Sequence, residues 1–339
     1  MRILTSKRID VVALGELLID FIQNGTSAQE NPLFEANPGG APCNVLAMLN
    51  KMGHKTAFIG KVGKDIFGHQ LKAVLEEIEI DTTNLLMDEK VRTTLAFVAN
   101  NVTGERSFSF YRSPGADMML TADEVQENLI SSAKIFHFGT LSMTHEGVRE
   151  ATKYALRIAK ENNLLISFDP NLRESLWDTL DNAKKQVDYG LHYCAILKIS
   201  DNEIRWFTGR ADFDEGVAIL QEKYHIPLIL LSMGRDGSRA YYDGMKVEVP
   251  GFIQEKTVET TGAGDTFMGS CLHYLLERVP EGLGGDGQAK NRLAEAGLIE
   301  DDLREMLTFA NAAASIITTR KGALKMMPTK EEIERLIVE

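Results

Sequence analysis

Short apolar runs alternate with amphipathic stretches along most of the chain. The apolar runs predict buried strands at Ile9–Leu14, Thr56–Lys61, Lys134–Phe138, Leu164–Phe168, Ala195–Ile199 and Leu228–Ser232. Helical spacing of apolar residues predicts helices at Ala41–Met52, Phe67–Ile78, His145–Asn162, Phe213–Tyr224, 302–318 and 329–338. Strands joined by helices predict an α/β fold with a mainly parallel sheet that is covered by helices on both faces.

Two regions depart from this alternation. Leu17–Asn37 and Arg92–Tyr111 each contain alternating strand patterns without a helix, and the second is interrupted by turn residues at 100–104. We predict that they form a small β-sheet, a lid made from about 15–38 and 91–116, on a single domain spanning 1–339. The alternative is that they are edge strands of the main sheet. A glycine-rich stretch at 282–288, followed by polar residues to 302, predicts an insertion.

The stretch from Glu259 to Phe267, ETTGAGDTF, is the most informative motif. Gly262 and Gly264 allow the backbone to approach a ligand closely, and the free N–H groups of a helix start attract anions. Asp265, in the same first turn, can accept a proton. An anion site beside a base suits phosphoryl transfer to an alcohol. The alternative is that Asp265 only caps the helix and the glycines only form a turn.

Composition narrows the class of protein. The chain has 339 residues, 44% of them hydrophobic, and a formal net charge of -12. This charge disfavours a nucleic-acid partner. No segment approaches the ~18 apolar residues of a membrane span, so no membrane association is predicted. Three cysteines without metal-binding spacing are typical of reduced thiols in the cytoplasm.

A second motif, NPGGAPCN at 37–44, spans the start of the predicted helix at Ala41–Met52. With this motif and TTGAGDTF in this order, the chain resembles the PfkB/ribokinase family of carbohydrate kinases, from Val11 to the C-terminus. The resemblance implies a ribokinase-like fold, ATP and Mg²⁺ as cofactors, and a homodimer formed through the lid. It also implies that Asp265 is the catalytic base and that the N–H groups of Gly262, Ala263 and Gly264 hold the transferred phosphoryl group.

The resemblance also implies residues that bind the sugar. They are Asp20, Gly39, Gly40, Asn44, Arg112 and Arg173. Asp20 follows the first strand, where a carboxylate can accept hydrogen bonds from two neighbouring hydroxyls. Each assignment to sugar binding has an alternative. Gly39 and Gly40 could only form the turn that enters a helix. Asp20 could be an exposed loop residue, and Arg173 could form a surface salt bridge.

On the nucleotide side, the resemblance assigns several residues to ATP. They are Lys198, Ser200, Ser232, Gly234, Gly237 and Asn311. Glu203 would orient Mg²⁺ through water, although Ser200 and Glu203 also form a capping-box pattern. Asn311 could instead be a tolerated polar residue on a helix. A possible K⁺ site would use Glu259, Thr261 and the backbone around Ile317 and Gly322, but position 259 is Glu where the family usually has Asp.

The segments GELLIDF, FYRSPGAD, DPNLRESLW and KISDNE resemble fructokinases most closely. The function implied is transfer of the γ-phosphoryl group of ATP to D-fructose, giving fructose 6-phosphate. A 2-keto-3-deoxygluconate kinase is the main alternative, because Arg173 could bind a carboxylate, and a ribokinase or nucleoside kinase is a further one. An inactive sugar- or nucleotide-binding regulator is the alternative from another class, but a protein that only binds would not need Asp265.

Overall fold

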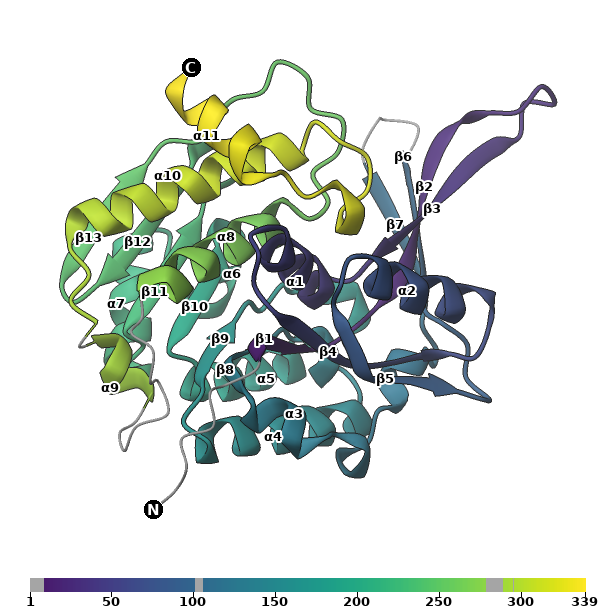
Figure 1. Cartoon of the computed structure of the whole chain (residues 1–339), viewed down its shortest axis with the longest axis horizontal. Coiled ribbons are helices and arrows are strands. Elements are labelled where there is room, and N and C mark those ends of the chain that lie inside the picture. Colours follow the sequence, from purple (N-terminus) through teal and green to yellow (C-terminus); the bar gives the residue numbers. More distant parts are fainter. Residues whose placement is uncertain (1–8, 101–105, 279–288, 295) are drawn as a thin grey trace.

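The computed structural model describes residues 9–100, 106–278, 289–294 and 296–339. Its main sheet has nine strands in the order β13-β12-β11-β10-β9-β8-β1-β4-β5 (Figure 1). These strands are β1 Ile9–Leu14, β4 Thr56–Gly63, β5 Asp81–Asp88, β8 Ala133–Phe138, β9 Leu165–Phe168, β10 Ile196–Ser200, β11 Leu228–Ser232, β12 Ser238–Tyr242 and β13 Met245–Val249. All pairings from β11 to β5 are parallel, whereas β12 and β13 pair antiparallel at one edge.

Helices cover both faces of this sheet, as predicted. Residues of β1 show why: Val11 and Ala13 join one hydrophobic cluster, and Val12 and Leu14 join the other, because successive side chains of a strand point to opposite faces. The first cluster includes α1 Ala41–Lys51, α2 Ile66–Glu77, α8 Ala263–Arg278, α10 Glu300–Ile317 and α11 Lys330–Val338. The second includes α3 Glu127–Ser131, α4 Glu146–Glu161, α5 Leu180–Tyr193, α6 Asp201–Thr208 and α7 Phe213–Tyr224.

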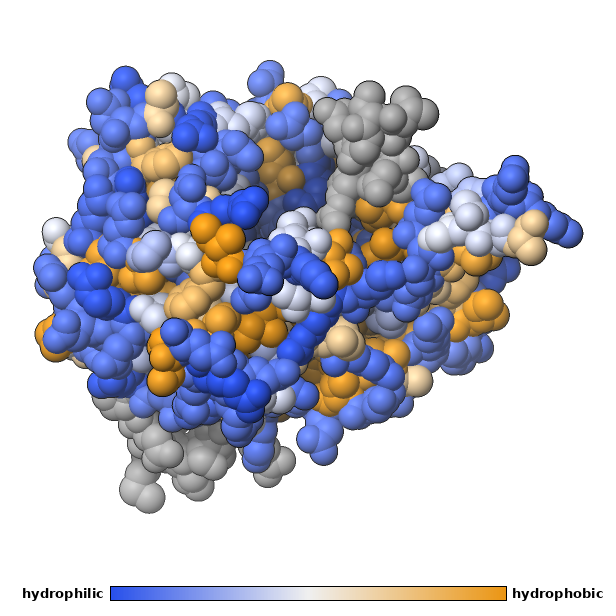
Figure 2. Space-filling model, turned by 90° about the horizontal axis from the view of Figure 1, so that it is seen from above, coloured by the Kyte–Doolittle hydropathy of each residue, from blue (hydrophilic) through white to orange (hydrophobic). Residues whose placement is uncertain are grey.

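The two helix-free regions form a separate four-stranded sheet, and the edge-strand alternative is wrong. Its order is β3-β2-β6-β7, with β2 Leu18–Thr26, β3 Pro32–Gly39, β6 Leu95–Asn100 and β7 Arg106–Tyr111. The hairpins β2–β3 and β6–β7 are antiparallel, and β2 and β6 pair in parallel. The β2–β3 hairpin extends well beyond the main body (Figures 1 and 2).

The aromatic residues of this lid sheet gather on one face. The Phe97 ring stacks on Phe21 with centroids 4.8 Å apart and meets Phe34 and Tyr111 edge-on. Phe21 also contacts Phe67 of α2, so this face of the lid is anchored to the main body near the base of β2. Asp20 and Val98 each stand next to one of these aromatic residues in a strand, so their side chains point to the opposite face of the lid sheet.

Every predicted strand and helix is present to within two residues at either end. The sequence prediction missed β5, β12, β13 and several helices, among them α5, whereas the capping-box pattern at Ser200 and Glu203 does start α6. The predicted insertion falls partly on 282–288, which lies outside the described residues; the short helix α9 Ala289–Ala294 follows it. None of the helices in the described ranges is long and apolar enough to cross a membrane.

Candidate active site

A cavity of about 220 Å³ lies between the lid and the carboxyl ends of the main-sheet strands. This edge is where parallel α/β sheets bind their ligands. Its lining includes many of the predicted site residues: Asp20, Gly40, Asn44, Arg173, Lys198, Thr261, Gly262, Gly264 and Asp265. Leu18, Val98 and Phe110 of the lid complete one wall. The structure thus brings the two sequence motifs together around one space.

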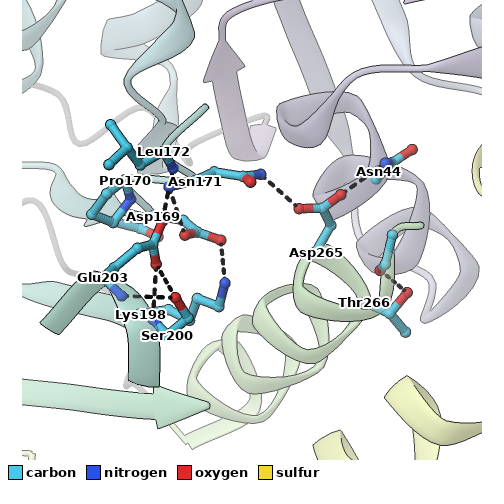
Figure 3. Close-up of polar contacts among 12 residues, drawn as sticks. Asn44, Asp169, Pro170, Asn171, Leu172, Lys198, Ser200, Glu203, Asp265 and Thr266 are labelled. Carbon is cyan, nitrogen blue, oxygen red and sulfur yellow. Dashed lines mark hydrogen bonds and ion pairs between the residues drawn. The ribbon is translucent and has the colours of Figure 1, made fainter. Parts of the chain in front are cut away.

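Asp265 lies at the centre of this arrangement. Its carboxylate accepts hydrogen bonds from Asn44 Nδ2 at Oδ2 (2.8 Å) and from Asn171 Nδ2 at Oδ1 (3.3 Å), as Figure 3 shows. Burial raises the pKa of Asp265, while the Asn44 hydrogen bond and the charge of Lys198 act in the opposite direction. The side chain is buried, contacts the cavity and has no ion-pair partner within 4.0 Å among the described residues. A carboxylate held by two neutral amides remains free to accept a proton.

The backbone around Asp265 forms an anion-binding turn. Gly262 has a φ of 79°, and α8 begins at the next residue. The N–H of Ala263 donates to Thr260 O at 3.3 Å, which leaves it only partly available. Among the described residues no backbone acceptor pairs with the N–H of Gly264 or Asp265, as is usual in the first turn of a helix. These free N–H groups can bind an anion.

Beneath this turn lies a charged triad that consists of buried Lys198 and Asp169 and half-buried Glu203. Lys198 Nζ lies 3.0 Å from Asp169 Oδ2, and a Cβ on Gly264 would lie 3.0 Å from the same Nζ. Burial acts to lower the pKa of Lys198, but the charges of Asp169 and Glu203 outweigh it, so the pKa is raised and the ammonium stays charged. A cation therefore sits directly beside the anion-binding turn, which fits a phosphate ligand.

Glu203 serves as the N3 residue of the α6 capping box. Its Oε2 accepts from Ser200 N (2.8 Å) and Ser200 Oγ (2.7 Å), and its Oε1 accepts from Leu172 N (2.7 Å). Burial acts to raise the pKa of Glu203, but Lys198 and these hydrogen bonds lower it overall. Oε2 uses both of its lone pairs, but Oε1 keeps one unused, so Glu203 fits a hard cation such as Mg²⁺ held through water.

The side of the cavity nearest the lid is built around Asp20 on β2. A Cβ on Gly39 would lie 2.4 Å from Asp20 Oδ2, so only glycine leaves room for this carboxylate. Gly40 has a φ of 137°, and a Cβ there would lie 2.3 Å from Glu16 O. Gly40 is therefore required by the close approach of the β3–α1 turn to the backbone just before β2, and Gly39 leaves room for the Asp20 carboxylate. Burial and then the charge of Glu259 raise the pKa of Asp20 to about 7, against the lowering effect of Arg173.

Arg112 is not brought to the cavity. Its guanidinium is buried and fully engaged: Nε donates to Asp117 Oδ2 (2.8 Å), Nη1 to Thr144 Oγ1 (2.8 Å) and Nη2 to Leu141 O (2.9 Å). It does not line the pocket, so its assignment as a sugar contact needs correction. Arg112 instead fixes the loop that leaves β7 against the body, because its paired charge cannot turn outward without leaving Asp117 buried and unpaired.

The other predicted nucleotide residues lie farther from this cavity. Ser232 ends β11, and Gly234 and Gly237, with φ of 58° and 101°, form the tight turn that follows. A Cβ on Gly237 would lie 2.1 Å from Val249 O, so the turn itself requires this glycine. None of these three residues lines the cavity around Asp265.

Asn311 on α10 is buried and makes its hydrogen bonds within the protein. Its Nδ2 donates to Val249 O (3.1 Å) and Pro250 O (3.2 Å), and its Oδ1 accepts from Ser238 Oγ (2.9 Å). Both N–H bonds of the amide are therefore used to hold the segment after β13. The structure supports a packing role for this side chain more directly than a polar contact with adenine.

The proposed K⁺ ligands lie on two adjoining loops. Gly322 N donates to Glu259 Oε2 at 3.3 Å, and the backbone N–H groups of Val258 and Glu259 donate to Thr318 O. Ile317 O accepts from Arg320 N at 3.1 Å. The longer Glu side chain thus links the loops directly, using one of its two oxygens. The second oxygen remains available for a cation.

Asn171 and Glu16 are among the site residues that sequence reasoning missed. Asn171 holds Asp265, and its φ of 45° shows that the backbone is turned to direct it there. Glu16 lines the cavity, accepts from Ala41 N (2.8 Å), and burial raises its pKa to about 7. Both stand within motifs that were noted, DPNLR and GELLIDF, so their place at strand ends was a usable signal.

Comparison with known proteins agrees with the family that the two sequence motifs suggested. Residues 8–330 match the model of the pfkB family carbohydrate kinases. The chain is 40% identical over 321 residues to probable fructokinase-2 of Arabidopsis thaliana, covering 94% of this chain and 93% of the relative.

Solved structures with the same fold include two fructokinases. A fructokinase from Xylella fastidiosa with bound ATP superposes with a TM-score of 0.86 at 29% identity, over 98% of this chain and 99% of the other. A double mutant of a Vibrio cholerae fructokinase, bound to fructose, ADP and potassium, gives 0.81 at 26% over 98% and 99%. With its two motifs joined around one cavity and the family match running over nearly its whole length, this chain belongs to the pfkB family of carbohydrate kinases.

Proposed function

We propose that this protein is a fructokinase that transfers the γ-phosphoryl group of ATP to D-fructose, forming fructose 6-phosphate and ADP. The observation that carries the kinase chemistry is the buried carboxylate of Asp265, which lies at the cavity beside the free N–H groups of α8. The choice of fructose is supported by the similarity to plant fructokinases over nearly the full length of both chains.

In this reaction Asp265 removes the proton of the sugar hydroxyl as its oxygen attacks the γ-phosphorus. The bond between that phosphorus and the bridging oxygen of ADP breaks, and ADP leaves with the electron pair. Burial raises the pKa of Asp265, which makes it a stronger base than a solvated carboxylate. Asn44 and Asn171 direct its oxygens without neutralising them.

Charge on the transferred group is stabilised by the chain itself. The N–H groups of Gly264 and Asp265 point from the start of α8, and Lys198 supplies a positive charge next to Gly264. Positioning and charge stabilisation are the main protein contributions to phosphoryl transfer. Glu203 is the residue that would hold Mg²⁺, which when bound adds positive charge near the phosphates.

The lid supports two further proposals. Leu18, Asp20, Val98 and Phe110 contact the cavity from the lid sheet, so its closure over the sugar would exclude water that competes as an acceptor. The opposite face carries exposed Phe34 and Tyr111. Such apolar exposure supports a homodimer in which two lids pair.

The substrate is tested with a panel of sugars, using release of ADP as the readout. We expect D-fructose to be phosphorylated with a kcat/KM at least tenfold above those of ribose and 2-keto-3-deoxygluconate. Arg173 lines the cavity and is exposed, so it could also pair with the carboxylate of the keto acid. Turnover of the keto acid with inert fructose would replace our proposal by the alternative kinase.

The Asp265→Asn variant tests whether Asp265 acts as the catalytic base or only caps α8. The amide keeps the size of the side chain but cannot take a proton, so kcat should fall by roughly 10²–10⁴. ATP binding and the melting temperature should stay close to those of the wild type. The matched control is Asp301→Asn, which removes an exposed first-turn carboxylate of α10. Equal and small losses of kcat in both variants would assign Asp265 to capping.

The affinity for sugar should depend on pH through Asp20. Its pKa is raised to about 7, so in the free protein its proton is lost only as the pH rises through neutrality. The carboxylate accepts hydrogen bonds from sugar hydroxyls, and affinity should therefore weaken roughly tenfold from pH 8 to pH 6. Calorimetry with D-fructose and no nucleotide measures this. The Asp20→Asn variant should bind weakly at both pH values, whereas unchanged wild-type affinity would exclude Asp20 from sugar binding.

K⁺ should activate the enzyme through the loops that contain Glu259 and Gly322. We expect a higher kcat in K⁺ than in choline at equal ionic strength, because a cation there would fix the loop leading to α8. The fructokinase structure with bound potassium supports this. Identical rates in the two buffers would show that the Glu259 link to Gly322 N replaces the ion.

A further inference from the structure

A cluster of metal-ligating side chains lies at the end of α8 away from the active site. His273 and Glu277 occupy one face of this helix, and His54 comes from the turn between α1 and β4. One ligand atom from each residue lies within 4.8 Å of the others, and His54 Nε2 is 2.7 Å from His273 Nδ1. His273 is eight residues beyond Asp265, or about 12 Å along the helix axis. The cluster is therefore separate from the kinase site.

The surroundings of the two imidazoles suit metal ligands. His273 is half-buried, and its Nδ1 faces His54 rather than solvent. His54 is largely buried, and its Nδ1 faces Asp10 Oδ2 at 3.8 Å. Asp10 is fixed by Lys134 Nζ and Lys55 N, each at 2.9 Å. A carboxylate behind an imidazole orients the ring and strengthens it as a metal ligand.

A hydrogen bond between the two imidazoles is the simpler explanation of the 2.7 Å contact. It does not require Glu277, whose carboxylate is exposed and lies within reach of both rings. Bonds of 2.0–2.1 Å to a tetrahedral ion would separate the two nitrogens to roughly 3.3 Å, a shift of about half an ångström. The nearby charges of Lys330 and Lys134 oppose a cation, and the carboxylates of Asp10 and Glu277 balance them.

We propose that His54, His273 and Glu277 bind a divalent transition-metal ion of the Zn²⁺ type, with water as the fourth ligand. Two imidazoles and one carboxylate suit Zn²⁺ or Co²⁺, whereas Mg²⁺ prefers an all-oxygen site. The ion would join the α1–β4 turn to the helix that carries Asp265. It is a structural cross-link, and it supplies no group to the phosphoryl transfer.

Titration of untagged, nucleotide-free protein with Co²⁺ tests the site, because tetrahedral Co²⁺ absorbs visible light. The wild type should bind one equivalent with tetrahedral bands that survive excess Mg²⁺, and equimolar Zn²⁺ should abolish them and raise the melting temperature. Glu277→Gln, at an exposed position, should fold normally and weaken Co²⁺ binding at least tenfold. His273→Gln should remove the bands.

The matched control is His192→Gln, which removes an exposed imidazole with its own carboxylate partner, Asp188, at 3.5 Å. It should leave the Co²⁺ affinity unchanged. The proposal is overturned if the wild type shows no tetrahedral bands. It is also overturned if Glu277→Gln binds Co²⁺ as tightly as the wild type, or if His192→Gln weakens binding as much as Glu277→Gln does.

Discussion

The site depends on keeping one carboxylate buried, ionisable and unpaired. Removing a carboxylate from water is costly unless a cation or hydrogen bonds compensate for it. For Asp265 the compensation comes from two side-chain amides and the more distant Lys198, with no direct ion pair among the described residues. A salt bridge would stabilise the charge more strongly but would also remove its basicity. The neighbouring Asp169 takes the ammonium of Lys198 instead.

Holding the Asp265 carboxylate with two side-chain amides requires three segments that are distant in the sequence to meet. Asn44 comes from α1, Asn171 from the loop after β9, and Asp265 from α8. The parallel sheet makes this possible, because the strands deliver their following loops to one edge, and α1 and α8 pack side by side on the same face (Figure 1). Buried residues such as Met48 and Gly269 lock the two helices: a Cβ on Gly269 would lie 2.8 Å from the Met48 Cβ.

The sequence was most informative where local pattern and burial agree. Val11–Leu14 and Leu228–Leu231 are continuous apolar runs in the sheet interior, and the strands that contain them, Ile9–Leu14 and Leu228–Ser232, match the prediction residue for residue. The strand Met245–Val249 was missed because it lies at the antiparallel edge, where Lys246 and Glu248 interrupt the apolar pattern. Arg112 was misplaced for a different reason. An arginine after a strand looks the same in sequence whether it faces a ligand or pairs with a buried Asp117, and only the packing decides.

Two elements that line the cavity, α8 and the β2–β3 hairpin, differ in how deeply they are buried. Helix α8 is buried along most of its length, from Asp265 through Cys271 to Leu275, so its position is set by the core. The β2–β3 hairpin extends into solvent, and most of its outer residues are exposed. Changes in the hairpin can therefore accumulate during evolution at little cost to folding. The wall of the cavity that the hairpin contributes can therefore differ among relatives while the end of α8 that carries Asp265 stays constant.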